Sequence, residues 1–139
     1  MQYNDFLYKY YSFIKFAFMI DEDIGCIPVV CYDINQNEYY VTDAAESFGF
    51  ILIYADSNAK INEALTMGDL FESLPKLPSR SLDLNIDRLP FDVESKYKDV
   101  AVSFYPNDKL CWAKVYFMSI GLDKSGEICL KLYCDNFIT

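Results

Sequence analysis

The chain has 139 residues, of which 53% are apolar and 17% aromatic, so it can bury the core of one domain. Its formal net charge is −9, which opposes direct binding to nucleic acid or to an anionic membrane surface. It contains no histidine, and this excludes catalytic triads and histidine general bases. We therefore expect a single domain spanning residues 1–139 that binds neither nucleic acid nor membrane.

Residues 3–18 carry apolar side chains at the spacing of a helical stripe. Asp5, Lys9 and Lys15 interrupt this stretch, and no uncharged apolar run in the chain is long enough to span a membrane. The same charges argue against a signal peptide. The first element is therefore expected to be an N-terminal helix of a soluble, cytoplasmic protein, with a strand from Ser12 onward as the competing interpretation.

Two segments rich in valine, isoleucine and tyrosine, residues 27–34 and 39–41, predict a β-hairpin with a polar turn at residues 35–38. Residues 43–55 begin with acids, as helix N-termini do, and continue with apolar residues at helical spacing. We predict a helix there, although the apolar run 48–54 would also suit a buried strand. Two further short helices are expected after Ser57 or Asn58 and after Thr66.

The C-terminal third begins with an irregular stretch, residues 75–92, in which three prolines predict a long surface connection. Strand-like runs at residues 100–105, 110–120 and 127–134, separated by short turns, predict an antiparallel three-stranded meander. One face of the middle run is uniformly apolar and should contact the helices; it comprises Cys111, Ala113, Val115 and Phe117. The expected fold is α+β, with an N-terminal helix, a β-hairpin, short helices and a C-terminal meander packed on helices.

The residues predict no metal site and no cofactor. The five cysteines include two pairs with the same spacing, 26/31 and 129/134, but residues five apart on a strand face opposite sides. The turn at residues 33–37 resembles the start of a calcium loop, yet the glycine and the final glutamate of such loops are missing. The chain also lacks the glycine patterns of phosphate and dinucleotide sites. We therefore expect that the protein is not an enzyme.

The excess negative charge is confined to the middle of the chain. Residues 21–72 hold 11 of the 21 carboxylates and one cation, Lys60, whereas residues 1–20 carry +1 and residues 73–139 sum to zero. An acidic surface of this kind favours a basic protein partner. The residues expected to contact it are acids and tyrosines around the hairpin: Asp21, Glu22, Asp23, Glu38, Tyr39, Tyr40, Asp43, Glu46 and Tyr54.

In size, acidity, α+β pattern and lack of catalytic motifs, the whole chain resembles the immunity proteins of bacterial toxin systems, especially those of contact-dependent growth inhibition. The resemblance rests on no motif, so it assigns no role to any residue. It implies a cytoplasmic protein that binds and neutralises a cognate toxin domain, often a nuclease with a basic groove. Two alternatives are a phage-type nucleic-acid mimic that inhibits a DNA-binding enzyme, and a small metal-dependent hydrolase that uses carboxylates.

Overall fold

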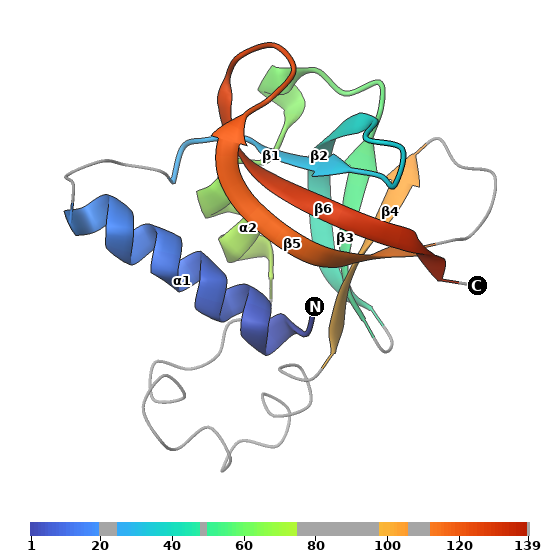
Figure 1. Ribbon diagram of the computed structural model, residues 1–139, viewed down its shortest axis with the longest axis horizontal. Coiled ribbons are helices and arrows are strands. Elements are labelled where there is room, and N and C mark those ends of the chain that lie inside the picture. Colours follow the sequence, from blue (N-terminus) through green and yellow to red (C-terminus); the bar gives the residue numbers. More distant parts are fainter. Residues whose placement is uncertain (20–24, 48–49, 75–97, 106–111, 139) are drawn as a thin grey trace.

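The computed structural model describes residues 1–19, 25–47, 50–74, 98–105 and 112–138, and within them six strands close into a barrel (Figure 1). The strands are β1 (Val29–Tyr32), β2 (Glu38–Ser47), β3 (Phe50–Asp56), β4 (Asp99–Tyr105), β5 (Trp112–Leu122) and β6 (Ile128–Ile138). Two helices, α1 (Tyr3–Met19) and α2 (Met67–Ser73), and the 3-10 turn η1 (Ile61–Glu63) complete the elements.

The strands follow one another around the barrel in chain order, so each strand pairs with its sequence neighbour and β6 closes on β1. Most pairs are antiparallel, whereas β3 with β4 and β1 with β6 are parallel. A parallel pair cannot be joined by a tight turn and needs a crossover connection. The chain between β3 and β4 contains η1 and α2, which places both elements beside the barrel wall.

The expected α+β arrangement, in which a three-stranded meander packs on helices, is wrong, because the sheet has six strands and is mixed. The helix expected over residues 43–55 is instead the hairpin of β2 and β3. Its apolar run is a buried strand: Ile51 and Ile53 belong to the barrel core, and Leu52 between them is buried as well. Three successive buried residues leave no polar alternation, so the composition of this run alone cannot separate a strand from a helix.

Two of the other expected helices are present in the structure. The stripe predicted over residues 3–18 forms α1, and Thr66 caps α2, its side chain accepting a hydrogen bond from the Asp69 backbone N–H at 3.1 Å. The helix expected after Ser57 or Asn58 is reduced to the single turn of η1. The irregular stretch 75–92 lies outside the described residues.

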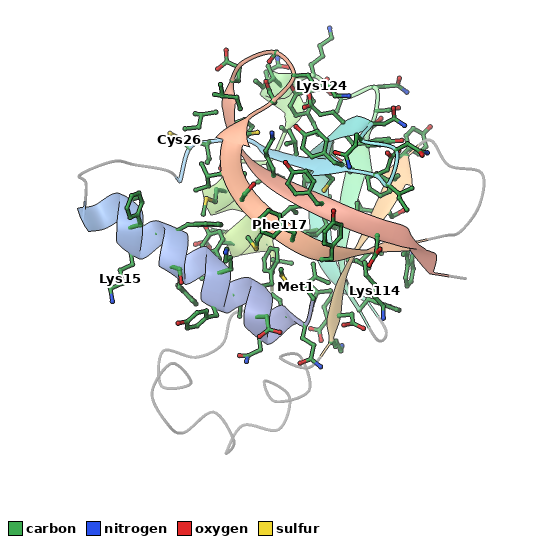
Figure 2. All side chains as sticks on the ribbon, viewed as in Figure 1. Met1, Lys15, Cys26, Lys114, Phe117 and Lys124 are labelled. Atoms are coloured by element: carbon green, nitrogen blue, oxygen red, sulfur yellow. The ribbon has the colours of Figure 1, made fainter. Side chains whose placement is uncertain are left out.

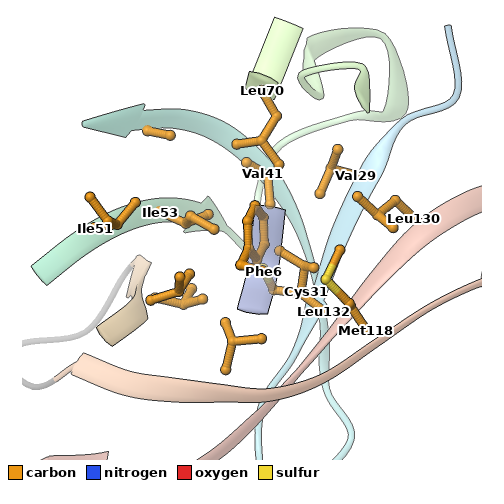
Figure 3. Close-up of a cluster of buried hydrophobic side chains, with 14 of the residues drawn as sticks. Phe6, Val29, Cys31, Val41, Ile51, Ile53, Leu70, Met118, Leu130 and Leu132 are labelled. Atoms are coloured by element: carbon orange, nitrogen blue, oxygen red, sulfur yellow. The ribbon is translucent and has the colours of Figure 1, made fainter. Parts of the chain in front are cut away.

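α1 buries its apolar stripe in the barrel core. Figure 3 shows Phe6 among side chains from several strands, and this residue is 1% exposed. Farther along the helix, the Tyr10 hydroxyl donates to the Met67 carbonyl oxygen at 2.7 Å, and its ring stacks on Phe71 at 4.9 Å. α1 and α2 are thereby joined to each other and to the barrel, so the helices belong to the same core as the strands.

The three strands expected in the C-terminal third are present as β4, β5 and β6, but the apolar face expected for the middle strand is only partly right. Ala113 and Val115 are buried in the core cluster that α1 and α2 share, whereas Phe117 is 48% exposed and Met118 is buried in its place; Cys111 lies outside the described residues. The register of β5 against β6 shifts between Val115 and Phe117. A bulge of this kind reverses which residues face inward, because side chains alternate along a strand.

Candidate functional site

The negative charge of the chain gathers on elements that touch one another, and we call this region the acidic side. It comprises β2, β3, η1 and α2; β2 pairs with β3, and both η1 and α2 contact β2. Between residues 38 and 73, the described chain has one cation, Lys60, and seven carboxylates: Glu38, Asp43, Glu46, Asp56, Glu63, Asp69 and Glu72. By contrast, the charges sum to +1 in α1 and to zero over residues 112–138.

Asp43 and Tyr54 are two expected contact residues that the structure brings together on the surface. They are cross-strand partners in the hairpin of β2 and β3, next to a register shift between Val41 and Asp43. Both are exposed, and Tyr54 is 39% exposed. The Asp43 carboxylate accepts a hydrogen bond from the Ala44 backbone N–H at 2.8 Å, which holds it against the strand. An aromatic ring beside a carboxylate suits contact with a cationic side chain.

Glu38 is an expected contact residue whose carboxylate has partners inside the protein. One oxygen accepts hydrogen bonds from the Tyr32 hydroxyl at 2.6 Å and from the Lys124 backbone N–H at 3.0 Å. Burial, followed by the hydrogen bond and the charge of Glu38, raises the pKa of Tyr32 well above its ordinary value. Tyr32 therefore stays protonated and remains a donor to Glu38 throughout the usual pH range.

Tyr39 and Tyr40 also make internal contacts through their hydroxyl groups. Tyr39 donates to Asp33 at 3.1 Å and places its ring 4.5 Å from that of Phe104, whereas Tyr40 donates to Asp123 at 3.2 Å. Burial is the largest cause of the raised pKa of both tyrosines, and the neighbouring aspartates add to it. Both side chains therefore fasten the hairpin of β1 and β2 to the rest of the barrel.

The other expected contact residues are not part of a common exposed cluster with Asp43. Glu46 forms an ion pair with Lys98, at 2.5 Å, so a cation from the C-terminal third offsets its charge. Asp21, Glu22 and Asp23 lie outside the described residues. Exposed carboxylates that we had not singled out lie on the acidic side instead: Glu63, Asp69 and Glu72. Their only sequence signature was the charge excess itself.

Two hairpin turns with the same hydrogen-bond pattern border the acidic side. In the first, one oxygen of Asp33 accepts from the backbone N–H groups two and four residues later, each at 2.9 Å. In the second, Asp123 accepts in the same way from Ser125 at 2.8 Å and Glu127 at 2.9 Å. The segment that resembles a calcium loop is thus an aspartate-stabilised turn, and the carboxylate of Asp33 is occupied by hydrogen-bond donors.

One residue in these turns has a costly backbone conformation, which leads to a prediction. Gln36 has φ 65°, and the corresponding residue of the second turn is Gly126, with φ 90°. Glycine adopts positive φ without a steric penalty, so Gln36→Gly should raise the free energy of unfolding by about 0.5–1 kcal/mol. Gly126→Ala should lower it by about 1 kcal/mol. Urea denaturation of both variants measures the two changes, and equal signs would contradict this account.

A hollow of about 220 Å³ lies over Tyr32 and Tyr133, near the second turn. Its charged groups hold the structure together: the Lys124 ammonium donates to the Gln36 carbonyl oxygen at 2.9 Å, and that of Lys131 lies 5.3 Å from the centre of the Tyr32 ring. The described parts of the chain contain no group of three histidine, cysteine, aspartate or glutamate side chains that could hold a metal ion. We therefore take the acidic side, rather than this hollow, as the candidate site.

The acidic side presents carboxylates and an exposed tyrosine, groups whose chemistry suits contact with cations. None of the helices in the described residues has the length and apolar character needed to cross a membrane. Comparisons with protein-family models, with curated proteins and with solved structures found no match to this chain.

Proposed function

We propose that the protein is an immunity protein, which acts in the cytoplasm by binding a basic toxin domain through its acidic side. The observation that carries this proposal is the separation of charge: seven carboxylates, of which Glu46 is paired with Lys98, and one lysine between residues 38 and 73, against a sum of +1 in α1 and of zero over residues 112–138. A toxin that acts on nucleic acid needs a basic groove for its substrate. A rigid acidic barrel wall would occupy such a groove and exclude the substrate.

Asp43 and Tyr54 are the pair that we expect to dominate this contact. They are exposed cross-strand neighbours on the barrel wall, which keeps them in place before the partner arrives. The tyrosine supplies apolar contact area and the carboxylate supplies charge, a combination typical of the residues that contribute most to an interface. The surrounding acids, such as Glu63 and Asp69, would mainly accelerate encounter by long-range attraction.

The test uses coexpression with the product of the neighbouring gene, followed by copurification and by rescue of growth. With a captured toxin domain, Asp43→Lys should slow association and weaken affinity by about tenfold or more, because it reverses a central charge. Asp5→Lys is the matched control: it makes the same charge change at an exposed residue of α1, outside the acidic side, and its effect should be small. Capture of a DNA-binding enzyme would instead support the nucleic-acid mimic.

Salt provides the second arm of the same experiment. Charge-driven association slows steeply as ionic strength rises, because the screening length falls from about 10 Å at 0.1 M to about 3 Å at 1 M salt. We expect the association rate constant to fall with salt far more than the dissociation rate constant rises. An association rate that is independent of salt, or equal losses for Asp43→Lys and Asp5→Lys, would overturn the proposal.

A further inference from the structure

Exposed apolar side chains gather on a different part of the molecule from the carboxylates. Of the eleven exposed large apolar residues among the described ones, seven lie on α1, β5 and β6: Tyr8, Ile14, Phe16, Tyr116, Phe117, Leu122 and Ile128. These are the elements whose charges sum to +1 in α1 and to zero over residues 112–138. Large exposed apolar groups rimmed by charges of both signs are characteristic of protein–protein contact surfaces.

The aromatic part of this surface is centred on Phe117 and Tyr133. Their rings are 5.8 Å apart, and Tyr133 also stacks on Tyr32 at 5.2 Å, so the group is anchored to the barrel. The bulge in β5 turns Phe117 outward, beside Tyr116, which is 54% exposed. Figure 2 shows Phe117 on the hairpin of β5 and β6. The Lys9 ammonium of α1 lies 5.9 Å from the centre of the Phe117 ring, so α1 is close to this part of the hairpin.

Two opposite charges flank Tyr133 symmetrically along β6. Lys131 precedes it by two residues and Asp135 follows it by two, while Leu132 and Cys134 between them point into the barrel. All three therefore lie on the outer face of the strand, because side chains alternate along it. We propose that this face is the docking surface for a second copy of the chain, with a two-fold axis passing close to Tyr133.

The charge pattern fits a second copy in this arrangement. When two β6 strands face each other antiparallel about Tyr133, Lys131 of each copy lies opposite Asp135 of the other, so the symmetry makes two attractive pairs. The tyrosines and Phe117 form the apolar centre, and the charged pairs form the rim. A molecule of net charge −9 repels its own copies, and a contact face whose charges balance reduces that repulsion.

The experiment is a charge swap at the two rim positions, followed by sedimentation equilibrium between roughly 5 and 500 µM protein. Wild-type protein should form dimers across this range. Lys131→Glu alone and Asp135→Lys alone each place like charges opposite one another, so each should weaken the dimer by about tenfold or more. The double variant Lys131→Glu/Asp135→Lys restores both attractive pairs at the wild-type net charge, so its dimer should recover.

Recovery of the dimer in the double variant would show that residues 131 and 135 pair between two copies. They are about 13 Å apart along one strand and cannot pair within a single chain. Phe117→Ser should abolish the dimer, whereas Tyr105→Ser, which removes an exposed aromatic ring from β4 outside this surface, should leave it unchanged. A monomer at every concentration, or single reversals without effect, would overturn the proposal. So would a failure of the double variant to recover. None of these outcomes depends on the partner of the acidic side.

Discussion

Replacing Phe6 with alanine is expected to lower the free energy of unfolding by about 3–5 kcal/mol. The side chain is 1% exposed and belongs to the core cluster shared by α1, α2 and the barrel strands. Its removal leaves a cavity within this cluster, whose members, such as Val41 and Leu70, belong to separate elements and are fixed by their own strand or helix. These walls can collapse only partly, so both the lost burial and the residual cavity destabilise the fold.

Tyr8→Ala is the control for this substitution, because it truncates an aromatic residue of the same helix that is 77% exposed. Its effect should stay within about 0.5 kcal/mol. Urea denaturation followed by circular dichroism measures both variants. A domain of this size has a total stability of about 5–15 kcal/mol, so Phe6→Ala should be folded but markedly less stable. Similar losses for the two variants would show that α1 does not contribute its apolar stripe to the barrel core.

The parts of the fold that could be predicted from the sequence are those specified by neighbouring residues. The stripe of α1 repeats over four turns, and the cap of α2 needs only Thr66 and Asp69, three residues apart. Turn residues likewise located the hairpin of β1 and β2, although β2 continues to Ser47, well beyond the expected end at Val41. Such features depend on a few successive side chains, so composition and spacing reveal them.

Closure of the barrel could not be predicted in this way, because it depends on pairing between distant strands. β1 pairs with β6 about a hundred residues later in the chain, and no local pattern records that contact. The error over residues 43–55 arises because Leu52 is buried like its neighbours Ile51 and Ile53, which removes the polar alternation that identifies a strand. The bulge after Val115 then reversed the expected faces of β5.

The candidate site was predictable as a region and not as a set of residues. Counting charges located the acidic segment, and the contacts among β2, β3, η1 and α2 explain why it forms one side of the molecule. Glu38 and Tyr40, however, bond to Lys124 and Asp123, which lie 86 and 83 residues away in the chain. The sequence does not distinguish an acid or a tyrosine that faces solvent from one that bonds to a distant turn, so only the fold could separate these roles.

Asp123→Ala is the second substitution for which we expect a large loss, about 2–4 kcal/mol of unfolding free energy. The carboxylate is 6% exposed and accepts hydrogen bonds from the Ser125 backbone N–H and hydroxyl, the Glu127 backbone N–H and the Tyr40 hydroxyl. Alanine removes the one acceptor that these donors share, so the turn loses the hydrogen bonds that fix its conformation. Asp123→Asn keeps one oxygen for the turn and should lose only about 1 kcal/mol at neutral pH.

The difference between wild type and Asp123→Asn should depend on pH with a definite sign. Burial favours the neutral acid, but the hydrogen bonds from Ser125, Glu127 and Tyr40 outweigh it and lower the pKa of Asp123 below its ordinary value. A carboxyl group whose pKa is lower in the folded state stabilises the fold above its unfolded pKa of about 4, and this contribution disappears as pH falls through the folded value. Chemical denaturation at a series of pH values should therefore show the advantage of wild type at pH 7 shrinking below about pH 4. If the stability difference between wild type and Asp123→Asn stayed constant below pH 4, the charge of Asp123 would not contribute to the stability of the turn. Only the geometry of its side chain would then matter.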